Sequence, residues 1–336
     1  MMQKKLKRLG LNLPLLPTTT VGSFPKPPYL LDGRRKFYAK QLETDELKLL
    51  EEQATREWIS IQEEIGLDVL VDGEMYRGDM VAYFADNLVG FKPSGLVRSY
   101  GNRYYRKPII FDEVKWQYPI TVEWWKFAQR LTKKPLKGVV TGPYTMMDWS
   151  FNEYYPTRRE ACLALANVLH KEVKSLADAG AKIIQIDEPA ISARPEELDF
   201  AIDAMRIVTK GIEAYFICHI CYGALEFIYP EMLKLPVDNF DLEMSSSELD
   251  LVDLFREQSF TKDLSFGVVD AHTHAIEDVA TIKKKIKRAL EVLEPRQLWI
   301  DPDCGLKTRT MDETIKKLKN MIEATKRVRH DLYQIN

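Results

Sequence analysis

Four residues in this chain have side chains of the types that bind zinc in proteins: His219, Cys221, Glu243 and Cys304. His219 and Cys221 are separated by one residue, whereas the other two lie farther along the chain. An imidazole, two thiolates and a carboxylate are ligand types of tetrahedral zinc. Each ligand falls at or just after the end of an apolar segment that is typical of a buried strand. This placement indicates a catalytic metal in a barrel mouth and not a small structural zinc knot.

The composition of this ligand set favours sulfur chemistry. A carboxylate such as Glu243 is the ligand held least strongly by a borderline-soft metal, so it could give way to an incoming soft ligand. A site that already holds two thiolates activates water poorly but suits a third thiolate. Zinc deprotonates a coordinated thiol and leaves it nucleophilic. The pattern therefore favours transfer of an alkyl group to sulfur.

Acidic residues follow two other apolar segments. Glu74 ends one of them and Asp187 ends the other. Such acids can cap the following helices, which is worth about 1 kcal/mol each. Alternatively, two acids on different strands can converge on an ammonium group, and we favour this interpretation. Ser23, with nearby backbone N–H groups, could hold a substrate carboxylate.

His272 and Trp149 are further candidates for chemistry. His272 could be a proton donor, because histidine titrates near neutral pH; a metal contact and a structural role remain alternatives. Asp270 could fix the tautomer of His272 or simply cap the strand end. His274 is expected to have a structural or solvent role. Trp149 could stack on a flat heterocycle or fill the core.

Eight short apolar segments alternate with longer helical patterns. The stretch 44–65 has apolar residues at helical spacing, 157–179 starts with a Thr cap, and 312–331 is a last helix. This alternation indicates parallel strands joined by crossover helices. With no linker between the segments, we predict an α/β fold, a (β/α)8 TIM barrel, in preference to a doubly wound sheet. The predicted strands are 18–22, 68–72, 138–141, 182–187, 215–219, 239–243, 265–270 and 297–301.

The candidate residues gather at the strand ends, and barrel active sites lie at that C-terminal rim. We predict a single catalytic domain over 1–336, with an N-terminal lead-in at 1–17 that covers the barrel bottom. A long insertion at 93–116 reads as a βα-loop hairpin with Gly-Asn at its turn. Its basic residues suggest a solvated hairpin, a lid or an anion contact.

The overall composition excludes several classes of protein. The 336 residues are 45% apolar and carry a net charge of −2, so nothing points to nucleic acid or a membrane surface. Four cysteines are too few for a disulfide scaffold and suggest a reducing compartment. No signal peptide or transmembrane run is apparent, so we expect a cytoplasmic protein. The basic run at 4–8 is expected to be a solvated arm.

From residue 18 to about residue 309 the chain resembles the catalytic C-terminal half of cobalamin-independent methionine synthase. The resemblance rests on segments with specific motifs, namely 19–25, 72–74 with 77–81, 141–143, 186–190, 219–222 and 302–309. It implies methyl transfer to the sulfur of homocysteine, which is bound as a thiolate on zinc, to give methionine.

The resemblance assigns roles position by position. The zinc (Zn²⁺) ligands would be His219, Cys221, Glu243 and Cys304. Homocysteine would be held by Val21, Gly22, Ser23, Glu74 and Asp187. His272 matches the proton donor of the family. Contacts to a folate donor are implied for Arg103, Tyr104 and Trp149.

The departures from the family concern the methyl donor. The full-length family carries an N-terminal barrel that helps to hold the polyglutamate tail of methyltetrahydrofolate, and its folate-contacting acid corresponds here to Ala193. Short single-barrel relatives are thought to use a methylated corrinoid. The expected donor is therefore methylcobalamin, a corrinoid protein or methyltetrahydrofolate, and the basic hairpin at 98–107 could dock a partner. A corrinoid donor needs no proton, so His272 would then be less essential.

The sequence thus predicts a zinc-dependent homocysteine methyltransferase. One alternative is alkyl transfer to another thiol such as coenzyme M; Glu74 and Asp187 argue against it, because a sulfonate substrate needs no acid for an ammonium group. A non-catalytic zinc-binding module is a second alternative. A porphyrinogen-type decarboxylase is disfavoured because that chemistry needs no zinc.

Overall fold

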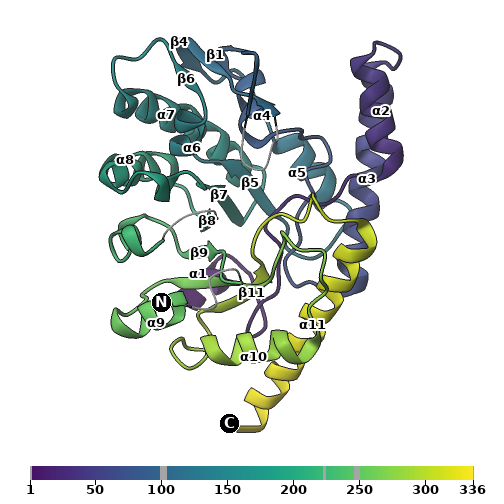
Figure 1. Ribbon diagram of the computed structural model, residues 1–336, viewed down its shortest axis with the longest axis vertical. Coiled ribbons are helices and arrows are strands. Elements are labelled where there is room, and N and C mark those ends of the chain that lie inside the picture. The colour runs from purple at the N-terminus through teal and green to yellow at the C-terminus, as the bar shows by residue number, and fades with distance from the viewer. Residues whose placement is uncertain (1, 99–103, 222–224, 246–249, 336) are drawn as a thin grey trace. The chain divides into compact units, whose positions relative to one another are not determined.

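Parallel strands alternating with helices form the centre of the fold (Figure 1). The computed structural model describes the chain except residues 1, 99–103, 222–224, 246–249 and 336. Six strands hydrogen-bond in the order β11-β10-β9-β8-β7-β5. Their bounds are β5 Lys137–Thr141, β7 Ile183–Asp187, β8 Tyr215–Ile220, β9 Asn239–Leu242, β10 Asp263–Val269 and β11 Leu298–Pro302.

Two further segments, predicted as strands 18–22 and 68–72, join this ring by single bridges. Thr18 bridges Ile300 of β11, and the N–H of Val69 donates to the Thr18 carbonyl at 3.0 Å. Leu70 in turn bridges Leu136, directly before β5. The predicted (β/α)8 barrel is therefore confirmed, although two of its eight predicted strands are present only as single β-bridges.

A side-chain network takes the place of a longer ladder at Thr18. Both the N–H and the hydroxyl of Thr18 donate to Asp68 Oδ2, at 2.9 and 2.8 Å. Arg329 donates to the same carboxylate and to the carbonyls of Leu15 and Leu16. Because these groups are satisfied by side chains, they are not available for a continuous strand pairing.

The helices agree well with the periodicity of the sequence. The predicted helix 44–65 is present over those residues, and Thr157 caps its helix by accepting from the Glu160 N–H. Their bounds are α1 Met2–Arg8, α2 Pro28–Tyr38, α3 Thr44–Ile65, α4 Met80–Asp86, α5 Val122–Gln129, α6 Pro143–Asp148, α7 Arg158–Asp178, α8 Leu198–Thr209, α9 Asp250–Glu257, α10 Val279–Ala289 and α11 Met311–Ile335.

The N-terminal basic run differs from its prediction. Residues 4–8 belong to helix α1, and Leu6 within it is buried. Lys4, Lys7 and Arg8 are exposed, as expected of a solvated run, but the segment is helical and its one apolar side chain is buried. A cavity of about 380 Å³ lies beside this lead-in, lined in part by Leu6, Lys7 and Trp299.

The predicted insertion is a small antiparallel structure. Strand β2 (Leu96–Arg98) pairs antiparallel with β3 (Tyr104–Arg106), which confirms the hairpin; its predicted Gly-Asn turn lies outside the described residues. Strand β1 (Val89–Lys92) pairs with β4 (Ile109–Lys115), and β6 (Phe151–Asn152) joins β4.

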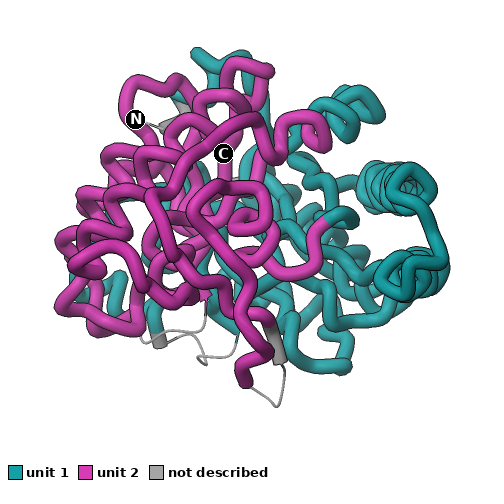
Figure 2. The backbone as a smooth tube through the Cα atoms, turned by 90° about the horizontal axis from the view of Figure 1, so that it is seen from above, with its two compact units in different colours: residues 1–76, 126–137, 241–336 teal, residues 77–125, 138–240 magenta. Residues whose placement is uncertain are grey.

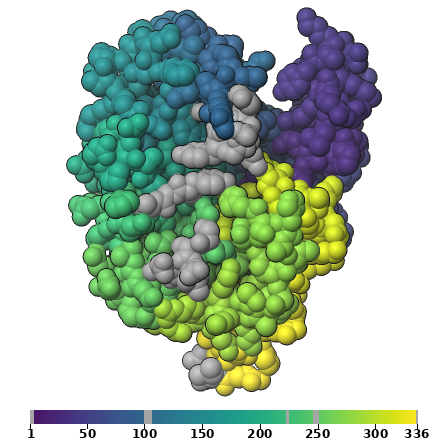
Figure 3. All heavy atoms as spheres, in the orientation of Figure 1, coloured from purple at the N-terminus to yellow at the C-terminus, as the bar shows by residue number. Residues whose placement is uncertain are grey.

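The chain forms two compact units (Figure 2). Unit 1 comprises residues 1–76, 126–137 and 241–336, and unit 2 comprises 77–125 and 138–240. The α2–α3 pair forms a surface block of unit 1 (Figure 3). The single catalytic domain stays a prediction. None of the described helices has the length and apolar character needed to cross a membrane.

Helix α11 begins with a capping box whose carboxylate is Glu313. The Thr310 N–H donates to Glu313 Oε2 at 2.9 Å, and the Glu313 N–H donates to Thr310 Oγ1 at 3.2 Å. The backbone N–H of Thr310, and then His274, lower the pKa of Glu313 from 4.5 to about 2. The ionised carboxylate therefore stabilises the folded protein, as expected of an anion at a helix N-terminus.

We expect Glu313→Gln to destabilise the protein at neutral pH, and the difference from wild type to shrink as pH falls from about 4.5 towards 2. The sign follows because a carboxylate with a lowered folded pKa loses its contribution only when it is protonated. Urea unfolding at several pH values measures this difference. Glu323→Gln, at a half-exposed position of α11, is the control. A pH-independent difference for Glu313→Gln would contradict the assignment.

Candidate metal centre and substrate site

Three of the predicted zinc ligands gather in one group. The ligand atoms of His219, Cys221 and Cys304 all lie within 4.8 Å of one another. His219 is in β8, Cys221 follows that strand, and both are buried, whereas Cys304 follows β11. One nitrogen and two sulfur donors fit a borderline-soft divalent metal such as zinc. Cys218, which is also in β8, is buried and outside this group.

Glu243, the fourth predicted ligand, lies just after β9 with its side chain mostly buried. It is not part of the group of described residues within 4.8 Å. Its Oε1 instead lies 3.8 Å from Nε2 of His272. The structure therefore groups three predicted ligands and places the carboxylate beside the predicted proton donor.

Asp303 is a supporting residue that the sequence interpretation missed. Its Oδ1 accepts from the N–H groups of Met244 and Ser245 at 3.0 and 2.9 Å, and its own N–H donates to the Val269 carbonyl at 2.9 Å. Burial raises the pKa of Asp303 to about 7, although the two N–H donors act in the opposite direction. The signal available in the sequence was an acid directly before the ligand Cys304.

The segment that contains Val21, Gly22 and Ser23 adjoins two other site segments of unit 1. The Leu306 N–H donates to the Ser23 carbonyl at 2.8 Å. A methyl group added at Gly305 would lie 2.1 Å from Ser23 Oγ, so this hydroxyl lies directly over the residue after Cys304. The N–H of Phe24 donates to the Gly73 carbonyl at 3.1 Å, next to Glu74.

Glu74 has a left-handed backbone conformation, with φ of 57°. For a residue other than glycine this costs roughly 1–2 kcal/mol. Asp72 holds the turn, because its Oδ1 accepts from the Glu74 N–H at 2.9 Å and its Oδ2 accepts from the Tyr76 hydroxyl at 2.8 Å. Strain that the surroundings enforce in this way is common at binding sites.

Lys26, which lies near Glu74, is a second residue of the site region that the sequence analysis did not identify. Burial, and then the nearby Arg34, lower the pKa of Lys26 to about 8, whereas Glu74 acts in the opposite direction. The side chain is partly accessible in the structure. Its position between Pro25 and Pro27 was the only signal in the sequence.

In unit 2 the acid pair Asp187–Glu188 divides into two roles. Asp187 ends β7, pairs in register with His219 of β8, and accepts from the Gln185 amide at 2.7 Å. Glu188 is buried and caps the short helix α6, accepting from the N–H groups of Tyr144 and Thr145. Burial raises the pKa of Glu188 to about 7 against these donors. Of these two acids, only Asp187 remains a candidate for binding an ammonium group.

The predicted donor-binding residues are less well defined. Trp149 lies at the C-terminal end of α6 and is partly exposed. Its backbone N–H donates to the Thr145 carbonyl at 2.9 Å. Arg103 lies outside the described residues. The backbone of Tyr104 belongs to β3, but its side chain is not described. Donor contacts at these residues stay predictions.

His272 lies on an exposed loop after β10. Its backbone N–H donates to Asp270 Oδ1 at 2.6 Å. Asp270 was predicted either to fix the tautomer of the His272 ring or to cap the strand end, and this contact to the backbone supports capping. His274 pairs with Glu313 at 2.9 Å and is largely exposed, as expected for a structural or solvent role.

A barrel with a His/Cys metal group at strand ends defines a class of metal-binding enzymes. Within that class the chain matches the family described as "Cobalamin-independent synthase, Catalytic domain" over residues 16–327, and it belongs to that family. It is therefore an enzyme of the homocysteine methyltransferase type.

Relatives and solved structures agree with this assignment. A methionine synthase of Sulfolobus acidocaldarius is 37% identical over 319 residues, covering 95% of this chain and 94% of that protein. A 5-methyltetrahydropteroyltriglutamate–homocysteine methyltransferase of Bacillus velezensis is 40% identical over 342 residues, covering 98% of this chain but 45% of that protein. A B12-independent methionine synthase from Shewanella, solved with selenomethionine, has a TM-score of 0.85 at 27% identity and covers 96% of this chain and 100% of that one.

We expect Gly142→Ala to destabilise the protein by about 1–3 kcal/mol, the usual cost of overpacking. Its methyl group would lie 2.2 Å from the Glu188 carboxyl, which is held by the first turn of α6. Gly95→Ala is the matched control, because nothing lies within 4 Å of its added methyl, and it should change stability by less than about 0.5 kcal/mol. Urea denaturation measures both; equal effects would contradict the proposed close approach.

Proposed function

We propose that this enzyme makes methionine by transferring a methyl group from a folate-type donor to homocysteine, with zinc as its metal. The observation that carries the proposal is the group formed by His219, Cys221 and Cys304. Glu243 is proposed as an exchangeable fourth ligand. When bound, zinc would supply the positive charge that keeps the homocysteine sulfur as a thiolate at neutral pH.

The residues around the metal group are proposed to bind the amino-acid part of homocysteine. Glu74 and Asp187 supply negative charge for the ammonium group. The backbone N–H of Glu74 donates to Asp72, and the side-chain amide of Gln185 donates to Asp187, so each acid is held in place by a local hydrogen bond. Ser23, with Val21 and Gly22, supplies hydroxyl and backbone donors for the carboxylate. Fixed acceptors and donors of this kind align the sulfur with the methyl group, and alignment is a large part of catalysis in such transfers.

His272 is proposed to be the proton donor. A folate that loses its methyl group leaves as an amine anion and needs a proton, and an imidazole is suited to supply one near neutral pH. The His272 side chain is about one-third exposed, so the proton can be replaced from water. Its position beside Glu243 places the acid near the ligand that yields to the substrate.

The names of relatives support a folate donor. Proteins of Bacillus and Campylobacter about 40% identical to this chain are named for 5-methyltetrahydropteroyltriglutamate. This chain spans 44–45% of the length of those proteins, so their donor is carried over here as part of the proposal. Trp149, Arg103 and Tyr104 are the proposed contacts to the pterin side of the donor. A cytoplasmic location fits this biosynthetic role.

We expect Cys304→Ser to lose zinc and methyltransferase activity together, with the rate falling more than about 100-fold, because even outer partners of a metal site are worth 10–100-fold. Metal analysis and initial rates of methionine formation measure the two effects. Cys218→Ala, which changes a buried cysteine outside the metal group, should keep its zinc. Full activity in a metal-free protein would contradict the proposal.

A comparison of methyl donors tests the proposal that the donor is a folate. With zinc and homocysteine present, we expect turnover with methyltetrahydrofolate, supplied as the monoglutamate or the triglutamate. His272→Asn should lower kcat with folate by about 10²–10⁴, the usual contribution of a general acid. Turnover with methylcobalamin and none with either folate would reject the folate donor and support the corrinoid alternative.

A further inference from the structure

The loop that carries His272 has no regular secondary structure. It runs from Asp270 at the end of β10 to Asp278, the N-cap of α10, and most of its residues are at least partly exposed. Exposed loops of this kind usually open at low free-energy cost. A general acid on such a loop needs something that fixes its position.

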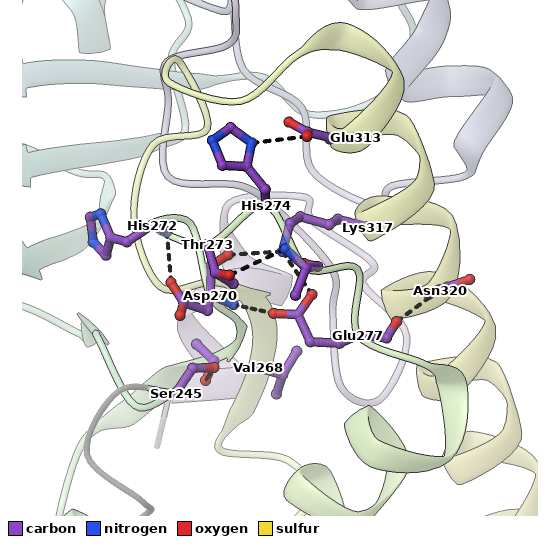
Figure 4. Close-up of polar contacts among 12 residues, drawn as sticks. Ser245, Val268, Asp270, His272, Thr273, His274, Glu277, Glu313, Lys317 and Asn320 are labelled. Carbon is purple, nitrogen blue, oxygen red and sulfur yellow. Dashed lines mark hydrogen bonds and ion pairs between the residues drawn. The ribbon is translucent and has the colours of Figure 1, made fainter.

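The buried side chain of Lys317 in α11 holds this loop in place. Its side chain is 0% exposed. Its Nζ donates to the carbonyl of Asp270 at 3.0 Å, to the carbonyl of Ala275 at 2.5 Å and to Glu277 Oε2 at 2.9 Å (Figure 4). The three donors of one ammonium are thus matched to three acceptors of one loop.

Two more residues on the same face of α11 hold the loop on either side of Lys317. Asn320 donates its amide to the Glu277 carbonyl at 2.8 Å, and Glu313 contacts His274 at 2.9 Å. Residues spaced by four and then three positions lie along one helix face. We call Glu313, Lys317 and Asn320 the α11 clamp.

Asp270 connects the clamp to His272. Its carbonyl accepts from Lys317, while its carboxylate accepts from the N–H of His272 at 2.6 Å. Its own N–H donates to Glu277 Oε1 at 2.7 Å, which closes the loop on itself. The His272 ring points away from Lys317 (Figure 4), and its Nε2 lies 3.8 Å from Glu243.

We propose that Lys317 is a positioning residue that sets the place of His272 for methyl transfer. The inference rests on the proposed function, since it matters only if His272 takes part in turnover. Lysine suits this position because its compact ammonium can donate in three directions at the end of an unbranched stem, which a planar guanidinium cannot. Burying such a charge is unfavourable unless it is fully paired, and here the loop provides the pairing.

The test is the double variant Lys317→Met with Glu277→Gln, in which the second change avoids leaving a buried carboxylate unpaired. We expect kcat to fall about 10–100-fold, since small misplacements of a reacting group cost up to about 10²-fold. The KM for homocysteine and the zinc content should stay within about twofold. Lys316→Met is the matched control, because Lys316 lies on the exposed side of α11 and pairs with Asp312.

Combination with His272→Asn separates positioning from a general structural effect. If Lys317 acts through His272, the clamp variant should lower kcat by less than about twofold further once His272 is gone. A fully additive loss, or no loss in the clamp variant, overturns the inference while the proposed function stands. If His272→Asn alone leaves kcat with folate unchanged, the proton-donor role fails, and this inference fails with it.

Hydrogen exchange gives a readout that does not depend on activity. Amides of residues 270–277 should exchange faster in the clamp variant than in Lys316→Met, while the strands β10 and β11 keep their protection. Unchanged exchange in this loop overturns the clamp whatever the kinetics show. If the double variant does not fold, Asn320→Ala, which removes one donor, should show the same pattern with a smaller loss of about 3–10-fold in kcat.

Discussion

The hydrogen bonds of Asp303 join the segments that leave the ends of β9, β10 and β11. Its carboxylate receives the N–H groups that follow Glu243, and the Asp303 N–H bonds to the end of β10, from which the His272 loop departs. Cys304 is the next residue along the chain. Gly267 leaves the necessary room, because a methyl group there would lie 2.1 Å from Asp303 Oδ1. One buried acid therefore joins the segments that carry the predicted metal ligand Cys304, the proposed exchangeable ligand Glu243 and the proposed proton donor His272.

Buried charged groups play the same part elsewhere in the molecule. Glu188 holds the first turn of α6 in unit 2, and Lys317 holds the His272 loop in unit 1. In each case a charge that would be costly to bury alone is satisfied by backbone groups, of a helix N-terminus for Glu188 and of a loop for Lys317. Regular strands need no such help, because their ladders already satisfy the backbone. The site residues stand where ladders end, so their positions depend on these anchors.

This dependence explains what the sequence could predict. Apolar segments with polar ends were enough to predict the barrel and the grouping of His219, Cys221 and Cys304, because strand direction alone brings such ends to one rim. Segments 18–22 and 68–72 were predicted as full strands, but the Thr18–Asp68 side-chain contacts replace most of the pairing. The roles of Asp303 and Lys317 join residues tens of positions apart, and no local pattern reveals such contacts. The helical form of residues 4–8, in which Leu6 is buried, was likewise not predicted.

The two substrates differ in how their binding residues are positioned, and this difference bears on how specificity arises. The backbones of Ser23 and Asp187, two proposed homocysteine contacts, are hydrogen-bonded to neighbouring segments at strand ends. Glu74, the third, donates its backbone N–H to the Asp72 side chain in its own turn. The proposed donor contacts stand on the β2–β3 hairpin and at the end of α6, which are appendages of a barrel and not part of its ladder. Loops and insertions change readily while a barrel keeps its core. On the proposed assignment, the acceptor site therefore follows from the barrel itself, whereas the donor site depends on the hairpin and on the end of α6.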